Sequence, residues 1–396
     1  MVLDITKFCK EVSSPAYIFS EEDFCSRAKH VKEAFGEDVE ICFSIKANPF
    51  LLNILPEDFS KVEVCSPGEL EICKALNISP EMIIFSGVNK SKAEIADALT
   101  YGVGTITAES RRHLEDINAC ALEMGRKFDV LLRLSNESQF GIDEEELLGY
   151  IAHWEKYSGC EIVGIHYFTG TQKKRGKAIA KELGRLTKLI DKIKNETGYV
   201  IEKIEYGTGL AVDYFKENAE ELELERLMEI APSIKELGAK VNLTVEMGRF
   251  FAASCGYYVS TVMDTKVNDG THYGIIDGGI HQLKYDGQTQ GMQIPPIIHI
   301  GKDCKTAEAV KETWGWTLCG SLCTTADVIA RNAEFTNLAC GDLLVFQRTG
   351  AYSVDEGIAM LLSRDMPSVY ILNKSGEMKL IRKRLDTHWL HIPGSV

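Results

Sequence analysis

The sequence lacks the features that mark several classes of protein. It contains no uninterrupted apolar run long enough to span a bilayer, which argues against a transmembrane helix. The stretch at residues 1–14, MVLDITKFCKEVSS, carries charges early and has no apolar signal-peptide core. Basic side chains are outnumbered by acidic ones, 44 to 58, and a net charge of -14 disfavours partners that attract basic surfaces. We therefore expect no nucleic-acid partner and no membrane partner.

The twelve cysteines form no CxxC pair, and no Cys/His spacing typical of a zinc site is present. This pattern predicts reduced thiols, a cytoplasmic protein and no bound metal. Hydrophobic residues make up 45% of the chain and charged residues 26%, which is typical of a globular protein. A length of 396 residues exceeds one ordinary core, so we expect two domains.

Short β-rich runs alternate with helix-like stretches up to residue 255. The runs are ICFSIKA (41–47), KVEVCS (61–66), EMIIFSG (81–87), GTITAES (104–110), KFDVLLRL (127–134), EIVGIHYFTG (161–170), EKIEYGTG (202–209) and VNLTVEMG (241–248). Between them, Ser66 and Pro67 stand where a helix would begin, and two stretches close on Gly102 and Gly125. Alternation implies parallel strands, and eight such units favour a closed (β/α)₈ TIM barrel; an open doubly wound sheet is the alternative.

Strand-like runs separated by turn signals follow residue 255, with little helix between most of them. The stretch NKSGE (373–377) is typical of a hairpin turn, and the early run SPAYIFS (14–20) can join this region as an additional strand. We therefore predict an α/β barrel at residues 25–255 and a mostly β domain, sandwich-like or barrel-like, at residues 1–24 plus 256–396.

Polar side chains and glycines stand at the ends of the predicted barrel strands, where barrel enzymes place their chemistry. They are Lys46, Glu63, Ser66, Arg133, His166, Thr169, Gly170, Gly207, Thr208, Gly209, Glu246, Gly248 and Arg249. A glycine turn lets backbone N–H groups approach a phosphate, and a buried carboxylate can pair with a protonated ring nitrogen. An imidazole can stack on a flat ring, and a neutral lysine can form a Schiff base. Together these groups predict a site for pyridoxal 5′-phosphate (PLP).

Each of these residues also has an ordinary structural explanation. Lys46 could bury its stem at a strand end and keep its ammonium in water. Glu246 could pair with Arg249 or Arg133, and His166 could be a hydrogen-bonded core histidine. Only the combination favours the cofactor site.

Seven stretches, in order along the chain, resemble the motifs of one family. They are FSIKANP, VEVCSPGEL, HYFTGT, YGTGL, EMGRFFAASCG, CGSLCTTAD and RTGAYS. The family is that of the fold-type III PLP decarboxylases, which includes the diaminopimelate, ornithine and arginine decarboxylases. The resemblance covers nearly the whole chain and implies an alanine racemase-like barrel with a C-terminal β domain.

The resemblance also implies a role for individual residues. Lys46 would hold PLP, His166 would stack on its ring, and Glu246 would pair with the pyridine nitrogen. The other cofactor-binding residues would be Glu63, Arg133, Thr169, Gly207, Thr208, Gly209, Gly248, Arg249 and Tyr352. Catalysis would remove the α-carboxylate of an amino acid through an external aldimine and a quinonoid, with Cys323 protonating the remaining carbon.

In this family the residues that correspond to Cys323 and Asp327 come from the second subunit, so the resemblance implies a homodimer with shared active sites. A buried apolar thiol is the alternative for Cys323. Glu246 argues against a racemase or epimerase, because alanine racemases of the same fold place an arginine there. A catalytically silent homologue that acts as a binding or regulatory protein is the other alternative.

Departures from the family pattern fall at substrate-facing positions. Thr324 follows Cys323 where diaminopimelate decarboxylases have a glutamate. The stretch IHQLKYD lacks their arginine–proline pair, so that His281 or Lys284 would take the place of the arginine. With Asp327, these are the candidate substrate-binding residues. The departures leave two substrate classes open: a diaminopimelate-like amino acid, or an acylated or carrier-tethered one. An acyl carrier protein is therefore a candidate partner, with KKRGK (173–177) as a candidate docking patch.

Overall fold

The computed structural model describes residues 4–302 and 313–394. The chain divides into two compact units, a barrel unit (Ser26–Val212 with Glu220–Phe251) and a β unit (Met1–Cys25, Asp213–Ala219 and Ala252–Val396). The segment Asp213–Ala219 belongs to the β unit, although the sequence analysis placed it with the barrel. No helix within the described ranges is long and apolar enough to cross a membrane.

Eight parallel strands close into a barrel, which confirms the predicted (β/α)₈ architecture and excludes the open doubly wound sheet. Each strand pairs with the next, and β2 pairs with β9 to complete the ring. The strands are β2 (Val39–Ser44), β3 (Lys61–Val64), β4 (Ile83–Phe85), β5 (Thr105–Ala108), β6 (Phe128–Leu134), β7 (Cys160–Phe168), β8 (Lys203–Gly207) and β9 (Asn242–Met247).

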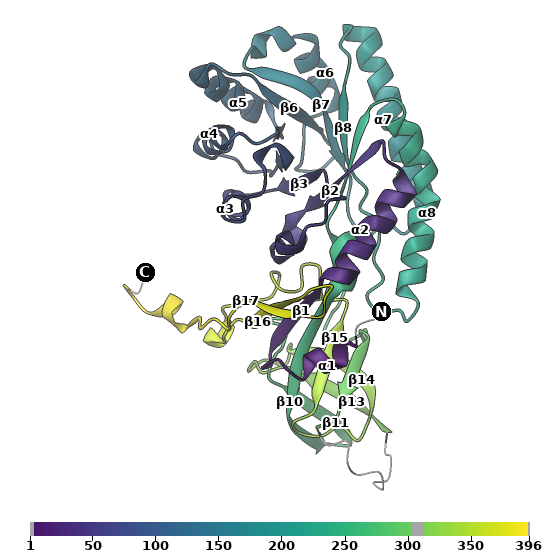
Figure 1. The fold of residues 1–396 in the computed structure, drawn as a ribbon, viewed down its shortest axis with the longest axis vertical. Helices are drawn as coiled ribbons and strands as arrows, with labels where there is room; N and C mark the ends of the chain where they lie inside the picture. Colours follow the sequence, from purple (N-terminus) through teal and green to yellow (C-terminus); the bar gives the residue numbers. More distant parts are fainter. Residues whose placement is uncertain (1–3, 303–312, 395–396) are drawn as a thin grey trace. The chain divides into compact units, whose positions relative to one another are not determined.

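Helices flank the barrel strands (Figure 1). They are α2 (Glu21–Phe35), α3 (Pro67–Ala75), α4 (Lys92–Tyr101), α5 (Arg111–Met124), α6 (Glu144–Ala152), α7 (Gly176–Thr197), α8 (Ala219–Gly238) and the short α9 (Arg249–Ala252). Local signals set several of their ends. Ser66 accepts a hydrogen bond from the Glu69 N–H at the start of α3, and Gly102 and Gly125 end α4 and α5 in the left-handed conformation.

Lys46 does not lie in a strand. The predicted strand at 41–47 ends at Ser44, and Ile45–Ala47 form one turn of 3₁₀ helix, followed by a second at Pro49–Ile54. Asn48 separates the two turns in extended backbone, and its side chain accepts a hydrogen bond from the Phe50 N–H. Cap and proline chemistry after the strand therefore override the β-like composition of the run.

The β unit contains a nine-stranded sheet. Its strands are β1 (Ala16–Ser20), β10 (Gly256–Asn268), β11 (Thr271–Ile276), β12 (Ile297–Ile300), β13 (Thr313–Cys319), β14 (Val328–Thr336), β15 (Leu343–Gln347), β16 (Ser368–Leu372) and β17 (Met378–Arg382). β1 pairs antiparallel with β10 and parallel with β16, which confirms that the N-terminal strand joins the C-terminal domain. β16 and β17 form the hairpin predicted at NKSGE.

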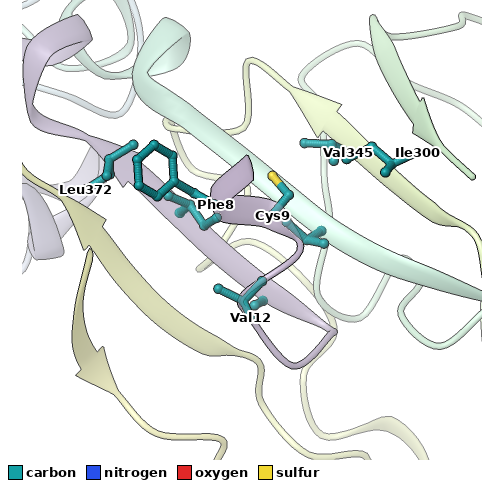
Figure 2. Packing of buried hydrophobic residues seen from close by; sticks show 9 residues of the cluster. Phe8, Cys9, Val12, Ile300, Val345 and Leu372 are labelled. Carbon is teal, nitrogen blue, oxygen red and sulfur yellow. The ribbon is translucent and has the colours of Figure 1, made fainter. Parts of the chain in front are cut away.

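The N-terminal segment also contributes to the core of the β unit. Phe8 and Cys9 of α1 (Ile5–Cys9) and the following Val12 are buried in a cluster with Val345 of β15 and Leu372 of β16 (Figure 2). Burial of such apolar side chains contributes roughly 1.5–3 kcal/mol each, so the first residues of the chain help to stabilise strands more than 300 positions away.

Candidate active site

Parallel strands bring their carboxyl ends to one end of the barrel, and four of the predicted site residues meet there. Lys46 follows β2, Glu63 lies in β3, His166 in β7 and Glu246 in β9. Ser44 is paired with Glu63 in register, so their side chains share the inner face of the barrel. The barrel topology thus unites residues that lie up to 200 positions apart.

The amine of Lys46 is held by acidic groups. Its Nζ donates a short hydrogen bond to Oε2 of Glu63 and lies 3.5 Å from Oε1 of Glu246. The sulfur of Cys65 is 3.4 Å from the same nitrogen. The lysine side chain is 38% exposed, whereas the two carboxylates are buried, so the amine stays open to an incoming molecule. This placement argues against a lysine that merely extends into bulk solvent.

Glu246 is a buried carboxylate with a full set of partners. Ser44 Oγ donates to its Oε1 at 2.6 Å, and His166 Nε2 lies 3.2 Å from its Oε2. Burial alone would raise the pKa of Glu246, but Lys46, followed by His166 and Ser44, lowers it well below its usual value. The carboxylate therefore stays ionised, as pairing with a protonated ring nitrogen requires.

Arg133 is paired within the barrel. Its Nη1 donates to Oε1 of Glu109 at 2.5 Å, and its guanidinium lies 4.8 Å from the centre of the Phe140 ring. The second oxygen of Glu109 accepts a hydrogen bond from the Gly141 N–H at 3.2 Å. Glu109 directly follows β5 and belongs to no motif that would mark it as a site residue in the sequence.

The turn at Gly207, Thr208 and Gly209 is tightly fitted against the loop after β7. A Cβ on Gly209 would lie 1.9 Å from the Gly170 carbonyl oxygen, and Gly209 has a φ of +59°. The Thr208 side chain is buried, and its hydroxyl accepts a hydrogen bond from the Leu210 N–H at 3.2 Å. Only glycine at position 209 allows this close approach to the Gly170 carbonyl.

Thr169 has a partner that the sequence did not reveal. Its hydroxyl donates to Oε1 of Glu182 at 2.7 Å, while Lys173 and Tyr206 donate to Oε2 at 2.7 and 2.6 Å. Lys173 is thus an ion-paired, mostly buried lysine and not part of an exposed basic patch. The other two predicted phosphate-site residues in this unit, Gly248 and Arg249, lie at the start of α9, where a Cβ on Gly248 would come within 2.9 Å of Ala47 Cβ.

Glu205 in β8 is a further acid of the barrel interior that was not among the predicted site residues. It is buried, pairs in register with His166 on β7, and neither of its carboxylate oxygens has a hydrogen-bond partner among the described residues. Burial, followed by the charges of Glu246 and Glu63, raises its pKa well above the usual value. A lone glutamate inside a strand carries no motif, so only the barrel's closure reveals this third interior acid.

The β unit holds the remaining predicted residues. Cys323 and Thr324 are exposed, and Tyr352 adopts a positive φ of 65°. Asp327 is buried, and its two oxygens accept hydrogen bonds from the Ile280 and Leu322 N–H groups, each at 2.8 Å. Asp327 therefore fixes the loop that carries Cys323.

The two candidate substrate residues after β11 differ in environment. His281 is buried, and burial lowers its pKa to about 4, so it is neutral. Lys284 is half exposed and lies 3.0 Å from Glu356. Both residues of this ion pair line a cavity of about 350 Å³ within the β unit, together with apolar side chains such as Leu283 and Ile358.

The residues of the barrel unit fit the predicted cofactor PLP. An accessible lysine amine lies among carboxylates, an ionised Glu246 is suited to a protonated pyridine nitrogen, and a glycine turn permits close backbone approach. In addition, the buried Nδ1 of His166 has no hydrogen-bond partner among the described residues.

Comparison with known proteins identifies the family and its cofactor. Residues 21–253 match the family described as pyridoxal-dependent decarboxylase, pyridoxal binding domain. The chain is 26% identical to the diaminopimelate decarboxylase of Aquifex aeolicus, over 99% of this chain and 94% of that protein. It is also 26% identical to the L-glutamyl-[BtrI acyl-carrier protein] decarboxylase of Niallia circulans, over 96% and 94% of the two chains.

A solved structure shares the fold. The diaminopimelate decarboxylase from M. jannaschii, in complex with L-lysine, superposes with a TM-score of 0.82 over 96% of this chain and 92% of that one, at 24% identity. The family match spans more than half of the chain, from α2 to the helix after β9. The chain therefore belongs to the pyridoxal-dependent decarboxylases of fold type III and is an amino-acid decarboxylase that uses pyridoxal 5′-phosphate.

Proposed function

We propose that Lys46 binds PLP, that Glu246 keeps the pyridine nitrogen of the cofactor protonated and that His166 lies against its ring. The observation that carries this proposal is the Lys46 amine, accessible yet bonded to Glu63 and 3.5 Å from Glu246. When bound, PLP draws electrons from the bond between the substrate's α-carbon and its carboxylate, so that carbon dioxide leaves.

Residues of the chain orient the carboxylate that would pair with the cofactor. Ser44 and His166 hold the Glu246 carboxylate in one orientation, and the ionised carboxylate favours a positively charged ring. A positively charged ring accepts electrons better than a neutral one, so the Glu246 carboxylate assists loss of the α-carboxylate.

We assign the phosphate to the turn Gly207–Gly209 with Gly248 and Arg249, all of which belong to the barrel unit. The close fit of Gly209 against Gly170 supports the turn as a cradle of backbone N–H groups. Thr169 would have to release Glu182 to join this group, so we place it at the edge of the phosphate site.

We propose that the active enzyme is a homodimer in which Cys323 of a second copy protonates the substrate carbon. Exposure of Cys323, on a loop fixed by Asp327, supports a thiol that can reach a partner's site. We also propose a cytoplasmic location, because all eleven described cysteines are free thiols, as a reducing compartment favours.

For the substrate we propose an amino acid whose distal end differs from that of diaminopimelate, such as an acylated or carrier-tethered amino acid. Thr324 supplies no carboxylate next to Cys323 for a distal amino group. Lys284 is engaged with Glu356 and offers one charge, without the two-pronged geometry of an arginine. A diaminopimelate-like substrate is the second candidate, supported by Lys284 itself.

The role of Lys46 is tested with Lys46→Ala. We expect the variant to lose the visible absorbance of the lysine-bound cofactor and at least about 10³-fold in carbon dioxide release. The matched control is Lys92→Ala, an exposed lysine on α4, which should keep both. A cofactor band that survives in Lys46→Ala contradicts the proposal.

The substrate is tested by measuring carbon dioxide release from meso-diaminopimelate, ornithine, arginine and lysine, and from glutamyl or ornithyl groups linked to an acyl carrier protein or to citrate. We expect the highest kcat/KM on an acylated or carrier-tethered amino acid. Turnover confined to free meso-diaminopimelate would contradict this choice and leave the role of Lys46 intact.

A further inference from the structure

Cys65, which has no role in the proposal above, lies beside the lysine of the site. Its Sγ is 3.4 Å from Lys46 Nζ and 3.1 Å from Oε1 of Glu63. The other oxygen of Glu63, Oε2, accepts the hydrogen bond from Lys46. Thiol and amine therefore bind the two different oxygens of one carboxylate.

The backbone around Cys65 is fixed by the start of α3. Its N–H donates to Oε2 of Glu69 at 2.6 Å, and the N–H of Glu69 donates to Ser66 Oγ at 3.2 Å. On the other side, Gly87 packs so closely that a Cβ there would lie 2.3 Å from the Cys65 carbonyl oxygen. The backbone that carries the thiol is therefore fixed beside Glu63.

The Cys65 thiol acts as a hydrogen-bond donor. Burial, followed by the charge of Glu63, raises the pKa of Cys65 well above its usual value, so the sulfur keeps its proton. A protonated thiol can donate to Glu63 without bringing a further charge into the site.

We propose that Cys65 is a positioning residue that holds the Glu63 carboxylate against the nitrogen of Lys46. This inference rests on the proposed role of Lys46 as the cofactor lysine. A carboxylate bound at both oxygens keeps one orientation, and a fixed carboxylate stabilises positive charge on the nearby nitrogen. Cys65 thereby helps to keep that nitrogen protonated when the cofactor is attached.

Other titratable groups surround this pair on the neighbouring elements. They are Cys42 on β2, Glu69 on α3, Lys90 after β4, Glu205 on β8 and Glu246 on β9. Glu246 in particular also stabilises positive charge on Lys46, so loss of the thiol should weaken the effect and not abolish it.

The test is a pH titration of the visible absorbance of the holoenzyme. We expect Cys65→Ala to lower the pH midpoint by about half a unit to one unit, a roughly threefold to tenfold loss of proton affinity at the nitrogen. We also expect kcat to fall about fivefold with little change in KM. Cys65→Ser retains a donor and should restore most of both values.

The matched control is Cys73→Ala, which removes a buried thiol from α3, the helix that begins just after Cys65, away from Glu63. It should leave the midpoint unchanged. If Cys65→Ala does not fold, Cys65→Val, which has similar volume and no donor, takes its place in the same titration.

A Cys65→Ala midpoint equal to that of the wild type, with the band lost in Lys46→Ala, overturns this inference and leaves the proposed function standing. A band that persists in Lys46→Ala overturns the proposed function, and this inference with it. A shift as large in Cys65→Ser as in Cys65→Ala would mean that packing and not hydrogen bonding is responsible, which also overturns the positioning role.

Discussion

Three acids, Glu63, Glu205 and Glu246, enter the barrel interior from different strands, and their surroundings decide their charge. Lys46, followed by His166 and Ser44, lowers the pKa of Glu246 despite its burial. Glu205 has no hydrogen-bond partner among the described residues, and burial, followed by the charges of Glu246 and Glu63, raises its pKa. One residue type thus provides an ionised and a protonated acid within a single barrel.

The raised pKa of Glu205 predicts a cost in stability at neutral pH. Above about pH 4.5, the usual value for glutamate, the unfolded chain releases this proton while the folded chain keeps it, so the free energy of unfolding falls as pH rises. Glu205→Gln removes the titrating group and with it this loss of stability. We expect the difference in urea midpoint between Glu205→Gln and the wild type to grow in favour of the variant as the pH rises from about 4.5 to about 7.

The control for this measurement is Glu37→Gln, whose side chain is 90% exposed and should show no such trend. A Glu205→Gln variant that is less stable than the wild type by the same amount at every pH would contradict a protonated Glu205.

At the scale of elements, an ion pair joins α2 to α8. Arg27 Nη2 lies 3.0 Å from Oε2 of Glu223, with side chains only 2% and 1% exposed, and the guanidinium lies 4.9 Å from the centre of the Phe250 ring. Both groups have lost their hydration, and the ion pair offsets part of the cost of burying the two charges.

Replacing one member of this pair should therefore be costly. We expect Arg27→Met to lower the free energy of unfolding by about 3–5 kcal/mol, because Glu223 loses its cationic partner in a buried position. The double variant Arg27→Met/Glu223→Leu should recover most of that loss. Urea unfolding measures both, and equal instability of the single and double variants would contradict the argument.

The neighbouring pair on the same helix supplies the control. Lys29 and Glu33 lie 3.8 Å apart with side chains 71% and 61% exposed. Lys29→Met should change the free energy of unfolding by no more than about 0.5 kcal/mol.

At the scale of the whole molecule, the candidate residues are divided between the two units of the chain. Lys46 and Glu246 belong to the barrel unit, whereas Cys323 and Tyr352 belong to the β unit. A homodimer that shares its sites would allow the barrel unit of one copy to act with Cys323 of the other.

Shared sites predict complementation between inactive variants. Lys46→Ala and Cys323→Ala should each be inactive or slow alone, but heterodimers of the two contain one site with both residues intact. Random mixing should therefore restore about a quarter of wild-type activity, measured as carbon dioxide release after co-expression. Activity that stays at the sum of the two variants would contradict the shared site.

The sequence by itself determined the parts that depend on local chemistry and periodicity. Eight β-rich runs at regular spacing predicted the barrel, and the glycines at 102 and 125 predicted helix ends that the structure confirms. The family motifs around Lys46, with the match over residues 21–253, identified the cofactor and the reaction class. These features can be recognised in the sequence because each of them depends on a few consecutive residues.

Only the tertiary structure decided which buried groups face one another. Cys65 and Glu63 meet Lys46 across two strands, and Glu205 lies among acids from β3 and β9, none of which a local pattern reveals. The segment Asp213–Ala219 likewise leaves the barrel unit although its neighbours on both sides remain in it. Charge state and hydrogen bonding in a barrel depend on contacts between distant strands, and such contacts exist only once the ring of strands has closed.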